Sequence, residues 1–450
     1  MNERKPSGAS FFCKKTILGS ILAQNGSIFL AKNLQISEKN SNFAADFGML
    51  CTFVHARDMI ETQKNRITMK KIFTLICAAL VGVAGVWAYS GEGTEGNPYL
   101  IGTSEDWAAI AGLIESGNSF DGKYIKLTND VSITSMWGTS STHFKGIFDG
   151  DGHTITFERG DNMETYLAPF RYIGGATIQN VKTGGTISTS RQFTSGLVAY
   201  ADGNNTITNC RASISINSGC PDDGTHGGLV ANIQGGTTTI TGCIYGGNMQ
   251  GSLTTNSGGL VGWTEGNKGA QLSLIDCIFA PASLSFKDSG SKTLARSRNT
   301  SDVTITNCFY TQKLGDEQGT KLYSIKGDQG IGVENTDAVT REYAAAGVAF
   351  CSTTLQFNGK IYASEGTNVI IRLSGNTAYS ASSGTLSNNG DGTYTLNMPG
   401  ENVIISGTGT PTGIEDVQSD DVPSIKFIKN GVLFIERDGK TYNAQGVEIR

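Results

Sequence analysis

Four cysteines occupy equivalent places in a repeated segment, so thiol chemistry is the first possibility that the sequence raises. If the repeats stack, these side chains lie above one another at about 4.8 Å, the spacing of neighbouring strands. That distance permits disulfides, whereas parallel side chains in a packed interior favour free thiols that act as small apolar groups. We expect the buried thiol column, and a linear column lacks the tetrahedral geometry of a zinc site. The four residues are Cys210, Cys243, Cys277 and Cys308.

An acidic segment contains Asp149 and Asp151, with Asp130 upstream. Carboxylate oxygens of this kind could bind Ca²⁺. Asp-Gly and Gly-Asp-Gly sequences are also what tight turns require, because glycine adopts positive φ and aspartate bonds its own backbone. We therefore expect a structural turn, keep a calcium site as the alternative, and assign no metal or cofactor to the chain.

Paired carboxylates could cleave a glycosidic bond if they lay on either side of it. The candidates lie in loops beside Gly and Ser, where a solvated charge is the default, and no repeat places two carboxylates in register on one outward face. We therefore predict a non-enzymatic protein with no catalytic or cofactor-binding residue. The alternative is a polysaccharide lyase or glycosidase. Its candidate residues would be Asp222, Asp223, Glu265 and Asp288.

Threonines form the last candidate surface. Successive residues of a strand point to opposite faces, so stacked Thr-Ile-Thr motifs would present outward threonine columns. Threonine is simply favourable at such positions, and this structural role is the one we expect. The columns could also form a flat hydrogen-bonding surface for a glycan or another chain. The residues are Thr206, Thr208, Thr239, Thr241, Thr304 and Thr306.

Internal repeats are the elements that must position these side chains. Three segments begin with Gly-Leu-Val and a small residue, roughly 30 residues apart, at residues 196–199, 228–231 and 259–262. A second motif that ends in cysteine follows each of them and recurs at residues 304–308, with a degenerate earlier copy at residues 178–181. A short β-rich unit cannot bury its apolar face alone, so its neighbours must stack on it.

A corner between two sheets is predicted inside the second motif. The residue before the closing Val or Cys is always Asn, Asp or Gly, the residues that best tolerate positive φ. We expect these residues to form one column, with the isoleucine before each corner and the Val or Cys after it pointing inward. The corner residues are Asn180, Asn209, Gly242, Asp276 and Asn307. The inward residues are Ile178, Ile207, Ile240, Ile275 and Ile305, then Val181 and the four cysteines.

Composition narrows the class of protein. The 450 residues include 59 Gly and 8 Pro, and 17% are charged, which is typical of a turn-rich β protein rather than a disordered chain. The mild net charge of -5 and the lack of a basic stripe argue against nucleic-acid binding. The sequence has no P-loop and no dinucleotide-binding glycine motif, and its 4 His offer little to a histidine metal site.

A secretory signal is predicted to begin at Met69. Its basic start leads into the apolar residues 72–86, and cleavage is expected after Ala88 or Ser90. An uncleaved membrane anchor is the alternative, because the apolar run is near the lower length limit for a span. Residues 1–68 would be an upstream extension. We expect the mature chain to be secreted, at the cell surface or extracellular, without a membrane span.

A helix is expected at the start of the mature chain. Thr103 or Ser104 can cap it, Glu105 and Asp106 fall in the first turn, where the helix dipole favours carboxylates, and Gly117 ends it. Its buried face would comprise Trp107, Ile110, Ala111 and Ile114.

Changes in composition and sequence pattern divide the mature chain into four segments. Residues 91–340 are the predicted β-helix with its N-terminal cap, and residues 341–408 a small β domain. A polar linker at residues 409–423 precedes a C-terminal hairpin module at residues 424–450, in which Asn-Gly and Asp-Gly pairs separate short apolar-alternating runs.

Residues 144–155, with the strand and helix before them, resemble the opening of GLUG-motif bacterial surface proteins and related bacterial β-helices. The resemblance covers residues 97–312. Residues 259–262 fit the Gly-Leu-hydrophobic-Gly motif in full, whereas Ala199 and Ala231 replace the last glycine in the other copies. The resemblance implies an all-β fold, namely a right-handed parallel β-helix (solenoid).

Residues 394–405 are similar to the small β domains of internalin-type B-repeats, which are spacers or binding modules. The C-terminal module resembles the tails of Gram-negative surface proteins that use a type IX-like secretion route. Together these resemblances imply an adhesin-like protein that presents a rigid face to a glycan or protein partner. A structural stalk is the second alternative.

Overall fold

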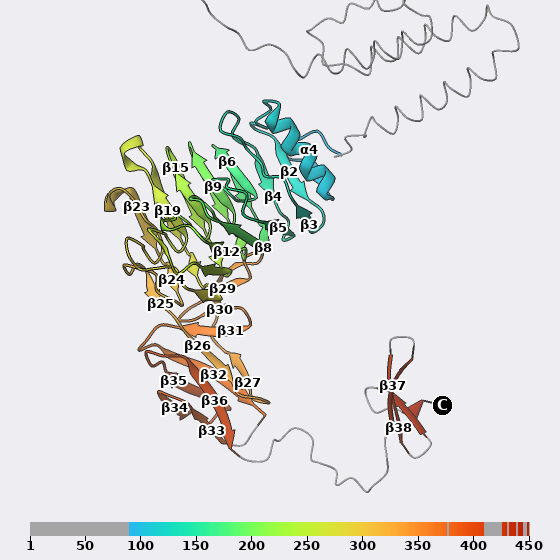
Figure 1. Ribbon diagram of the computed structural model, residues 1–450. Coiled ribbons are helices and arrows are strands. Elements are labelled where there is room, and N and C mark those ends of the chain that lie inside the picture. The colour runs from blue at the N-terminus through green and yellow to red at the C-terminus, as the bar shows by residue number, and fades with distance from the viewer. Residues whose placement is uncertain are drawn as a thin grey trace, which may run out of the picture. The chain divides into compact units, whose positions relative to one another are not determined.

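The computed structural model describes residues 90–375, 378–408, 425–429, 432–437, 440–443 and 448–449 (Figure 1). Residues 1–68 and the predicted signal segment lie outside these ranges. A helical cap leads into a parallel β-solenoid of about 5 turns, which confirms the predicted fold class. Among the described residues, no helix is long and apolar enough to cross a membrane.

The N-terminal cap contains β1 (Tyr99–Ile101) and α4 (Ser104–Glu115). Thr103 and Asp106 form a reciprocal capping box, in which each side chain accepts a hydrogen bond from the other residue's backbone N–H. The predicted apolar face of the helix is buried, and the ring of Trp107 stacks on Trp137 with 3.9 Å between centroids. The helix thereby closes the apolar N-terminal end of the solenoid.

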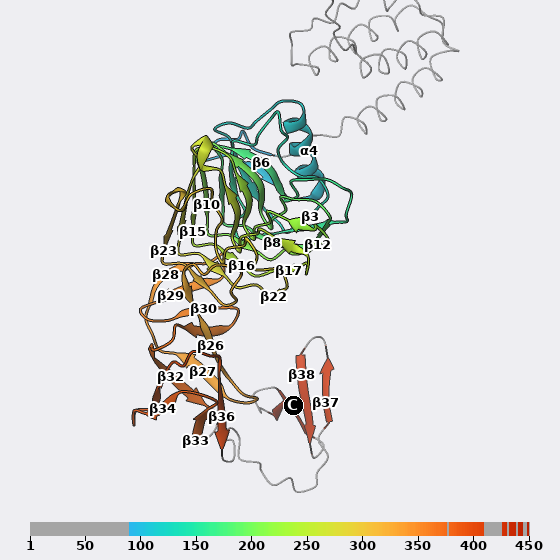
Figure 2. The ribbon, with the colours of Figure 1, turned by 60° about the vertical axis from the view of Figure 1, so that its left-hand side comes forward.

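Parallel strands from successive turns build three long sheets in the described part of the solenoid, which we name after one strand each. Several strands of the β10 sheet lie side by side in Figure 2. The β10 sheet contains β1, β2 (Tyr124–Leu127), β4 (Ile147–Asp149), β7 (Thr177–Gln179), β10 (Asn205–Thr208), β15 (Thr237–Thr241), β20 (Gln271–Ile275) and β23 (Val303–Thr306). The β9 sheet contains β6 (Phe170–Gly174), β9 (Val198–Asp202), β14 (Val230–Ile233) and β19 (Val261–Thr264).

The β8 sheet joins these two. It contains β3 (Val131–Ile133), β5 (Thr154–Arg159), β8 (Lys182–Thr189), β11 (Arg211–Ala212), β12 (Ser215–Ser218), β16 (Ile244–Tyr245), β17 (Asn248–Gln250), β21 (Ile278–Phe279), β22 (Ser283–Leu284), β24 (Phe309–Tyr310) and β25 (Thr320–Lys321). The short strands β13 (Asp222–Asp223) and β18 (Thr254–Thr255) pair separately.

The interior of the solenoid is lined by columns of apolar side chains. Ile178, Ile207 and Ile240 are fully buried in adjacent strands of the β10 sheet. The prediction that Ile275 continues this column is wrong, because the register pairs Ile240 with Leu274. Leu274 is fully buried, and Ile275 takes an outward position beside Thr241. In the third copy, as in the others, one residue separates the inward residue from the corner, so Leu274 is the inward residue.

The four repeat cysteines are free and buried, as predicted. The backbone N–H of Cys210 lies 3.4 Å from the sulfur of Cys243, and the N–H of Cys277 lies at the same distance from the sulfur of Cys308. Burial raises the pKa of the Cys243 and Cys277 thiols well above the ordinary value, so both remain protonated and unreactive.

We expect Cys243→Ala to lower the free energy of unfolding by about 1–2 kcal/mol, the cost of a small truncation in a packed core. The native thiols should resist alkylation and react once the chain is unfolded without reductant. Chemical denaturation of the variant and mass mapping of alkylated peptides check both outcomes. Peptides joined by a Cys210–Cys243 or Cys277–Cys308 bridge would contradict the thiol column.

The predicted corner column is confirmed. Asn180, Asn209, Gly242, Asp276 and Asn307 have φ values from 51° to 60°, and each directly follows a strand of the β10 sheet. The Asn209 amide donates to the Asn180 side-chain oxygen at 2.8 Å, and the Asn307 amide donates to the Asp276 carboxylate at 2.5 Å. The column therefore carries short polar ladders on either side of Gly242.

The small β domain begins earlier in the chain than the sequence indicated. Its first strands, β26 (Tyr323–Gly327), β27 (Gly332–Asn335) and β28 (Val339–Tyr343), pair with strands of the same domain, so the predicted boundary at residue 340 moves to about Tyr323. The remaining strands are β29 (Val348–Cys351), β30 (Leu355–Phe357), β31 (Lys360–Ala363), β32 (Asn368–Ser374), β33 (Ala378–Ala381), β34 (Thr385–Asn388), β35 (Thr393–Asn397) and β36 (Val403–Thr408).

The corner column is also where the small β domain contacts the solenoid. The Tyr343 hydroxyl donates to the buried Asp276 carboxylate at 2.7 Å, and the Arg341 guanidinium lies 3.0 Å from the same carboxylate. A Cβ on Gly242 would lie 2.1 Å from the Tyr343 ring. Gly242 thus leaves the space in the column that the tyrosine ring occupies.

The C-terminal module forms an antiparallel meander of β37 (Ile425–Lys429), β38 (Val432–Arg437), β39 (Lys440–Asn443) and β40 (Glu448–Ile449). The strands agree with the hairpins predicted there. The Asn-Gly and Asp-Gly pairs themselves lie outside the described residues.

Candidate binding face

The outer face of the β9 sheet places four large polar or aromatic side chains in one row. Parallel pairing puts Tyr172, Tyr200, Asn232 and Trp263 in register on β6, β9, β14 and β19. The three aromatic side chains are partly exposed, and Asn232 is nearly buried between them. Because adjacent strands are about 4.8 Å apart, the row offers one such group at each step along the solenoid axis.

Loop residues extend the N-terminal half of this row into an aromatic cluster, which we define as His143, Tyr166, Tyr172, Phe193 and Tyr200. Ring centroids lie 5.1 Å apart for Tyr172 and Tyr200, and 5.4 Å apart for His143 and Tyr200. Tyr166 stacks on Phe193 at 4.6 Å and contacts Tyr172 at 5.3 Å. All five side chains are partly exposed, so they form an aromatic surface rather than a core.

Two members of the aromatic cluster have an unfavourable backbone conformation. Tyr166 and Phe193 have φ values of 60° and 68°, in the left-handed region that bulky residues avoid. Strand bridges show that they occupy a second corner of the solenoid, which continues through Thr225 and Asn256 to Gly290, all at positive φ. Asn and Gly adopt positive φ at a lower conformational energy than other residues do. The aromatic residues at the first two positions of this corner therefore store strain of about 1–3 kcal/mol each. Strained backbone positions of this kind cluster at functional sites.

The tyrosine hydroxyls of the aromatic cluster are available as hydrogen-bonding groups. Burial raises the pKa of Tyr166, Tyr172 and Tyr200 above the ordinary value, so the phenols stay protonated. Tyr166 also hydrogen-bonds to Asn232. Burial lowers the pKa of His143, which favours its neutral form. The cluster therefore combines ring faces with uncharged polar groups.

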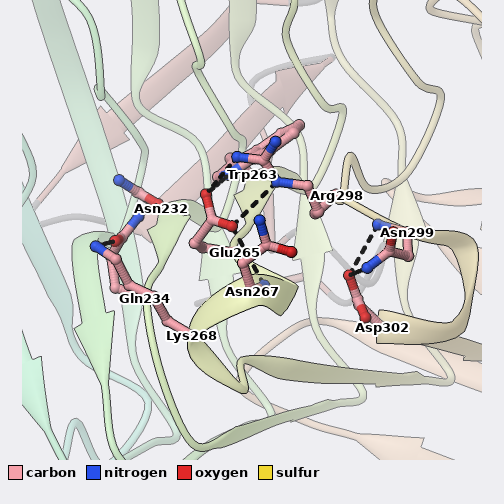
Figure 3. Close-up of polar contacts among 9 residues, drawn as sticks. All are labelled: Asn232, Gln234, Trp263, Glu265, Asn267, Lys268, Arg298, Asn299 and Asp302. Atoms are coloured by element: carbon pink, nitrogen blue, oxygen red, sulfur yellow. Dashed lines mark hydrogen bonds and ion pairs between the residues drawn. The ribbon is translucent and has the colours of Figure 1, made fainter.

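The C-terminal half of the face is polar and is shown in Figure 3. Glu265 accepts two hydrogen bonds from Arg298, both at 3.1 Å, and one from the Trp263 indole at 3.2 Å. The Arg298 guanidinium, followed by the other hydrogen bonds, lowers the pKa of Glu265 to about 2. The carboxylate is therefore an anion that holds the indole and the guanidinium in place.

A chain of side-chain hydrogen bonds links this half to the row. The Lys268 ammonium donates to Gln234 at 2.6 Å, and the Gln234 amide donates to Asn232 at 2.8 Å (Figure 3). Arg296 and Arg298 place their guanidinium carbons 5.0 and 5.5 Å from the centroid of Trp263. These side chains are held by one another before any ligand binds.

The carboxylates considered for catalysis do not come together on this face. Asp222 and Asp223 form β13, which pairs with β18, and Asp223 accepts a hydrogen bond from Thr225 at 2.7 Å. Asp288 accepts the backbone N–H of Gly315 at 2.9 Å. Of the four candidates, Glu265 is the one on the β9 sheet face, and its partner is Arg298.

The acidic segment uses its carboxylates internally. Asp149 accepts the backbone N–H of Asp151 at 2.8 Å, and Asp151 pairs with Lys126 at 3.0 Å. Asp130 accepts the N–H of Thr154 at 2.8 Å. Within the described residues, no three His, Cys, Asp or Glu side chains gather as metal ligands would. Asp151 has a φ of 50°, as the turn interpretation requires.

The predicted threonine columns face outward on the β10 sheet. Thr206 pairs with Thr239, and Thr208 with Thr241, so the side chains are aligned along the axis. Ser273 and Ile275 take the equivalent positions in the next turn, before Thr304 and Thr306. These threonine columns present hydroxyl and methyl groups, whereas the β9 sheet face also presents aromatic rings.

A buried Ser–His pair lies beneath the second corner. Nε2 of His226 is 2.9 Å from Oγ of Ser218, and Nδ1 accepts the backbone N–H of Thr194 at 3.2 Å. Since Nδ1 is an acceptor, Nε2 carries the proton, and the imidazole cannot take one from the serine. Burial lowers the pKa of His226 to about 3. The pair is a structural hydrogen-bond network.

Sequence reasoning did not identify the aromatic cluster. Its members come from strands and loops of different turns, and the repeats were aligned on glycine and cysteine rather than on aromatic residues. The sequence nevertheless contains a pattern that could have identified two members of the cluster. Tyr172 and Tyr200 occupy equivalent positions once Phe170 is aligned with Val198, the residue that follows the Gly-Leu pair of the first copy.

Comparison of the sequence with protein-family models and with curated proteins gives no match. Among solved structures, the chain is similar to one described as a "putative immunoglobulin A1 protease" from Bacteroides ovatus. The identity is 16% over 51% of this chain and 86% of that chain, with a TM-score of 0.29.

Proposed function

We propose that the protein is a non-enzymatic, adhesin-like binding protein that holds a glycan on the outer face of its β9 sheet. The observation that carries this proposal is the aromatic cluster beside a row of amide and charged side chains. Aromatic rings stack on the apolar C–H faces of sugars, and amides and hydroxyls pair with sugar hydroxyls. The stacked β-strands make the face rigid, which limits the entropy lost on binding.

Backbone strain supports a binding role over a purely structural stalk. At this corner the later turns carry Thr225, Asn256 and Gly290, none of them aromatic, and a stalk has no need of partly exposed rings there. Partly exposed, mutually stacked rings are a large apolar surface for a soluble face, and such patches mark interaction sites.

The state of Glu265 supports binding over glycoside hydrolysis. Hydrolysis requires a carboxylic acid that donates a proton to the leaving oxygen. Glu265 has a pKa of about 2 and is held by Arg298, so it is charged at neutral pH and cannot donate. The other candidates, Asp222, Asp223 and Asp288, belong to other parts of the solenoid.

Display at the cell surface or secretion is part of the proposal. It is supported by the predicted signal that begins at Met69 and by the small β domain, which resembles spacer modules. The hydrogen bond from Tyr343 to Asp276 joins this domain to the solenoid that carries the binding face.

A glycan array combined with reducing-sugar and lyase-absorbance assays on the purified protein tests the function. Saturable binding without turnover is the expected result. Turnover of a bound polysaccharide would instead identify an enzyme. The absence of both binding and turnover over a broad array would contradict the proposal and would favour a purely structural stalk.

A further inference from the structure

The direction of the binding row indicates the form of the ligand. Tyr172, Tyr200, Asn232 and Trp263 follow one another across four strands, so the row runs along the solenoid axis. The strand spacing of about 4.8 Å is close to the length of one pyranose in an extended chain. A linear polymer laid along the axis would meet one outward side chain per sugar, whereas a single terminal sugar would use one position.

The cations on the face already donate hydrogen bonds within the protein, although the partner of Lys268 is neutral and Nε of the Arg171 guanidinium is buried without a partner among the described residues. Arg298 pairs with Glu265, and Lys268 donates to Gln234. The guanidinium of Arg171 donates to the Thr165 carbonyl at 3.0 Å and lies 5.8 Å from the Tyr172 ring centroid. To bind these cations, an acidic ligand would have to replace hydrogen bonds that they already make within the protein.

A third arginine also donates its hydrogen bonds within the protein. Arg296 donates to the Asn256 and Gly262 carbonyls, and burial lowers the pKa of its guanidinium. It lies beneath the polar half of the face and beside Trp263, where it supports the indole. Apart from the exposed Lys268 ammonium, the groups that remain to meet a ligand are rings, phenol hydroxyls and the Gln234 amide, all without charge.

We propose that the face binds an uncharged, linear polysaccharide along the solenoid axis, with one sugar ring for each of the strands β6, β9, β14 and β19. This inference rests on the proposed function and specifies its ligand class. The aromatic cluster would stack on the rings at one end, and the partly exposed Trp263 indole and Gln234 amide would meet the sugars toward the other end.

Titration of the purified protein with oligosaccharides of increasing length tests the inference. The uncharged probes are cello-, xylo- and manno-oligosaccharides of two to six sugars, and the acidic probes are oligogalacturonate and heparin fragments. Affinity for an uncharged series should rise until about four sugars, the number of strands in the row, and then level off. It should change less than roughly two-fold between low and high salt, because screening acts on charges.

Lys268→Gln separates the two ligand classes, because Lys268 is exposed and its charge is the one that an acidic ligand would reach most easily. The salt dependence of affinity for the uncharged series should be equally small in wild type and variant, whatever the loss of the Lys268–Gln234 hydrogen bond does to that affinity. Tighter binding of the acidic probes that weakens with salt and with Lys268→Gln would overturn the inference and leave the proposed function standing. Binding that is independent of length would also overturn it. Silence toward every probe on the array would contradict both proposals.

Discussion

Gly242→Val should lower the free energy of unfolding by about 3 kcal/mol, whereas Thr241→Val beside it should change that free energy by less than about 0.5 kcal/mol. Gly242 has a φ of 60°, which a β-branched residue adopts only under strain. Its Cβ would lie 2.1 Å from the Tyr343 ring, so the tyrosine must move and give up its hydrogen bond to the buried Asp276. Thr241 only exchanges an outward strand side chain.

Denaturant unfolding of the two variants measures this difference, and a third variant separates its causes. Adding Tyr343→Ala to Gly242→Val removes the ring that the new side chain meets. The steric part of the cost should then be small, and the backbone strain should remain. Equal stability of Gly242→Val and Thr241→Val would contradict both the corner and the domain contact.

Acidification should destabilise the protein through His226. The imidazole has a folded pKa of about 3 and an ordinary value of 6.5, so between these values the unfolded chain binds a proton that the folded protein does not. Stability is therefore fully present above about pH 6.5 and is lost as the pH falls toward 3. The loss through this group should reach roughly 3 kcal/mol by pH 4. Protonation would also set an Nδ1–H against the N–H of Thr194, which donates to that nitrogen.

The variant His226→Gln should remove this part of the pH dependence. It should be less stable than wild type at pH 7, because it disturbs the buried network with Ser218. Its free energy of unfolding should then fall less steeply between pH 6.5 and 4, so the two stability curves converge. Parallel curves for wild type and variant would show that His226 does not titrate on unfolding.

The corner and the cysteine column could be predicted because each repeats a backbone requirement or a packing position in every turn. Asn180, Asn209 and Asn307 share a residue type that positive φ selects, and a repeated selection is visible in one sequence. Gly242 also leaves space for an aromatic ring, and this second requirement could not be predicted from the repeats. The ring that fills its space is Tyr343, which lies roughly 100 residues later in a different domain.

The Ile275 error has a local origin. Alignment on the isoleucine placed Ile275 in the inward column, although Ile275 directly precedes the corner residue, whereas in the other copies one residue separates the isoleucine from the corner. Counting back three residues from the cysteine gives Leu274, the inward residue, in this copy as in the rest. Spacing to the corner is a better guide than residue identity, because the corner fixes which face each preceding residue takes.

The candidate binding face could not be predicted from the sequence, for a different reason. The aromatic cluster is made by register between turns, and two of its members, Tyr166 and Phe193, occupy a corner where their residue types are unfavourable. Pattern reasoning finds residues that suit their positions. Functional residues that strain their positions can be recognised once the backbone is known.

The central claim is that the aromatic cluster exists for binding and not for folding. The most direct test is the variant Tyr166→Asn with Phe193→Asn, which gives both corner positions the residue type that the corner prefers. Its free energy of unfolding should be equal to that of wild type or higher, because relief of strain offsets the lost ring contact. Affinity for the glycan identified on the array should fall at least about ten-fold, or roughly 1.4 kcal/mol. The control, Thr206→Ala with Thr239→Ala on the β10 sheet face, should bind as wild type does. Unchanged affinity in the corner variant, together with a large loss of stability, would contradict the account.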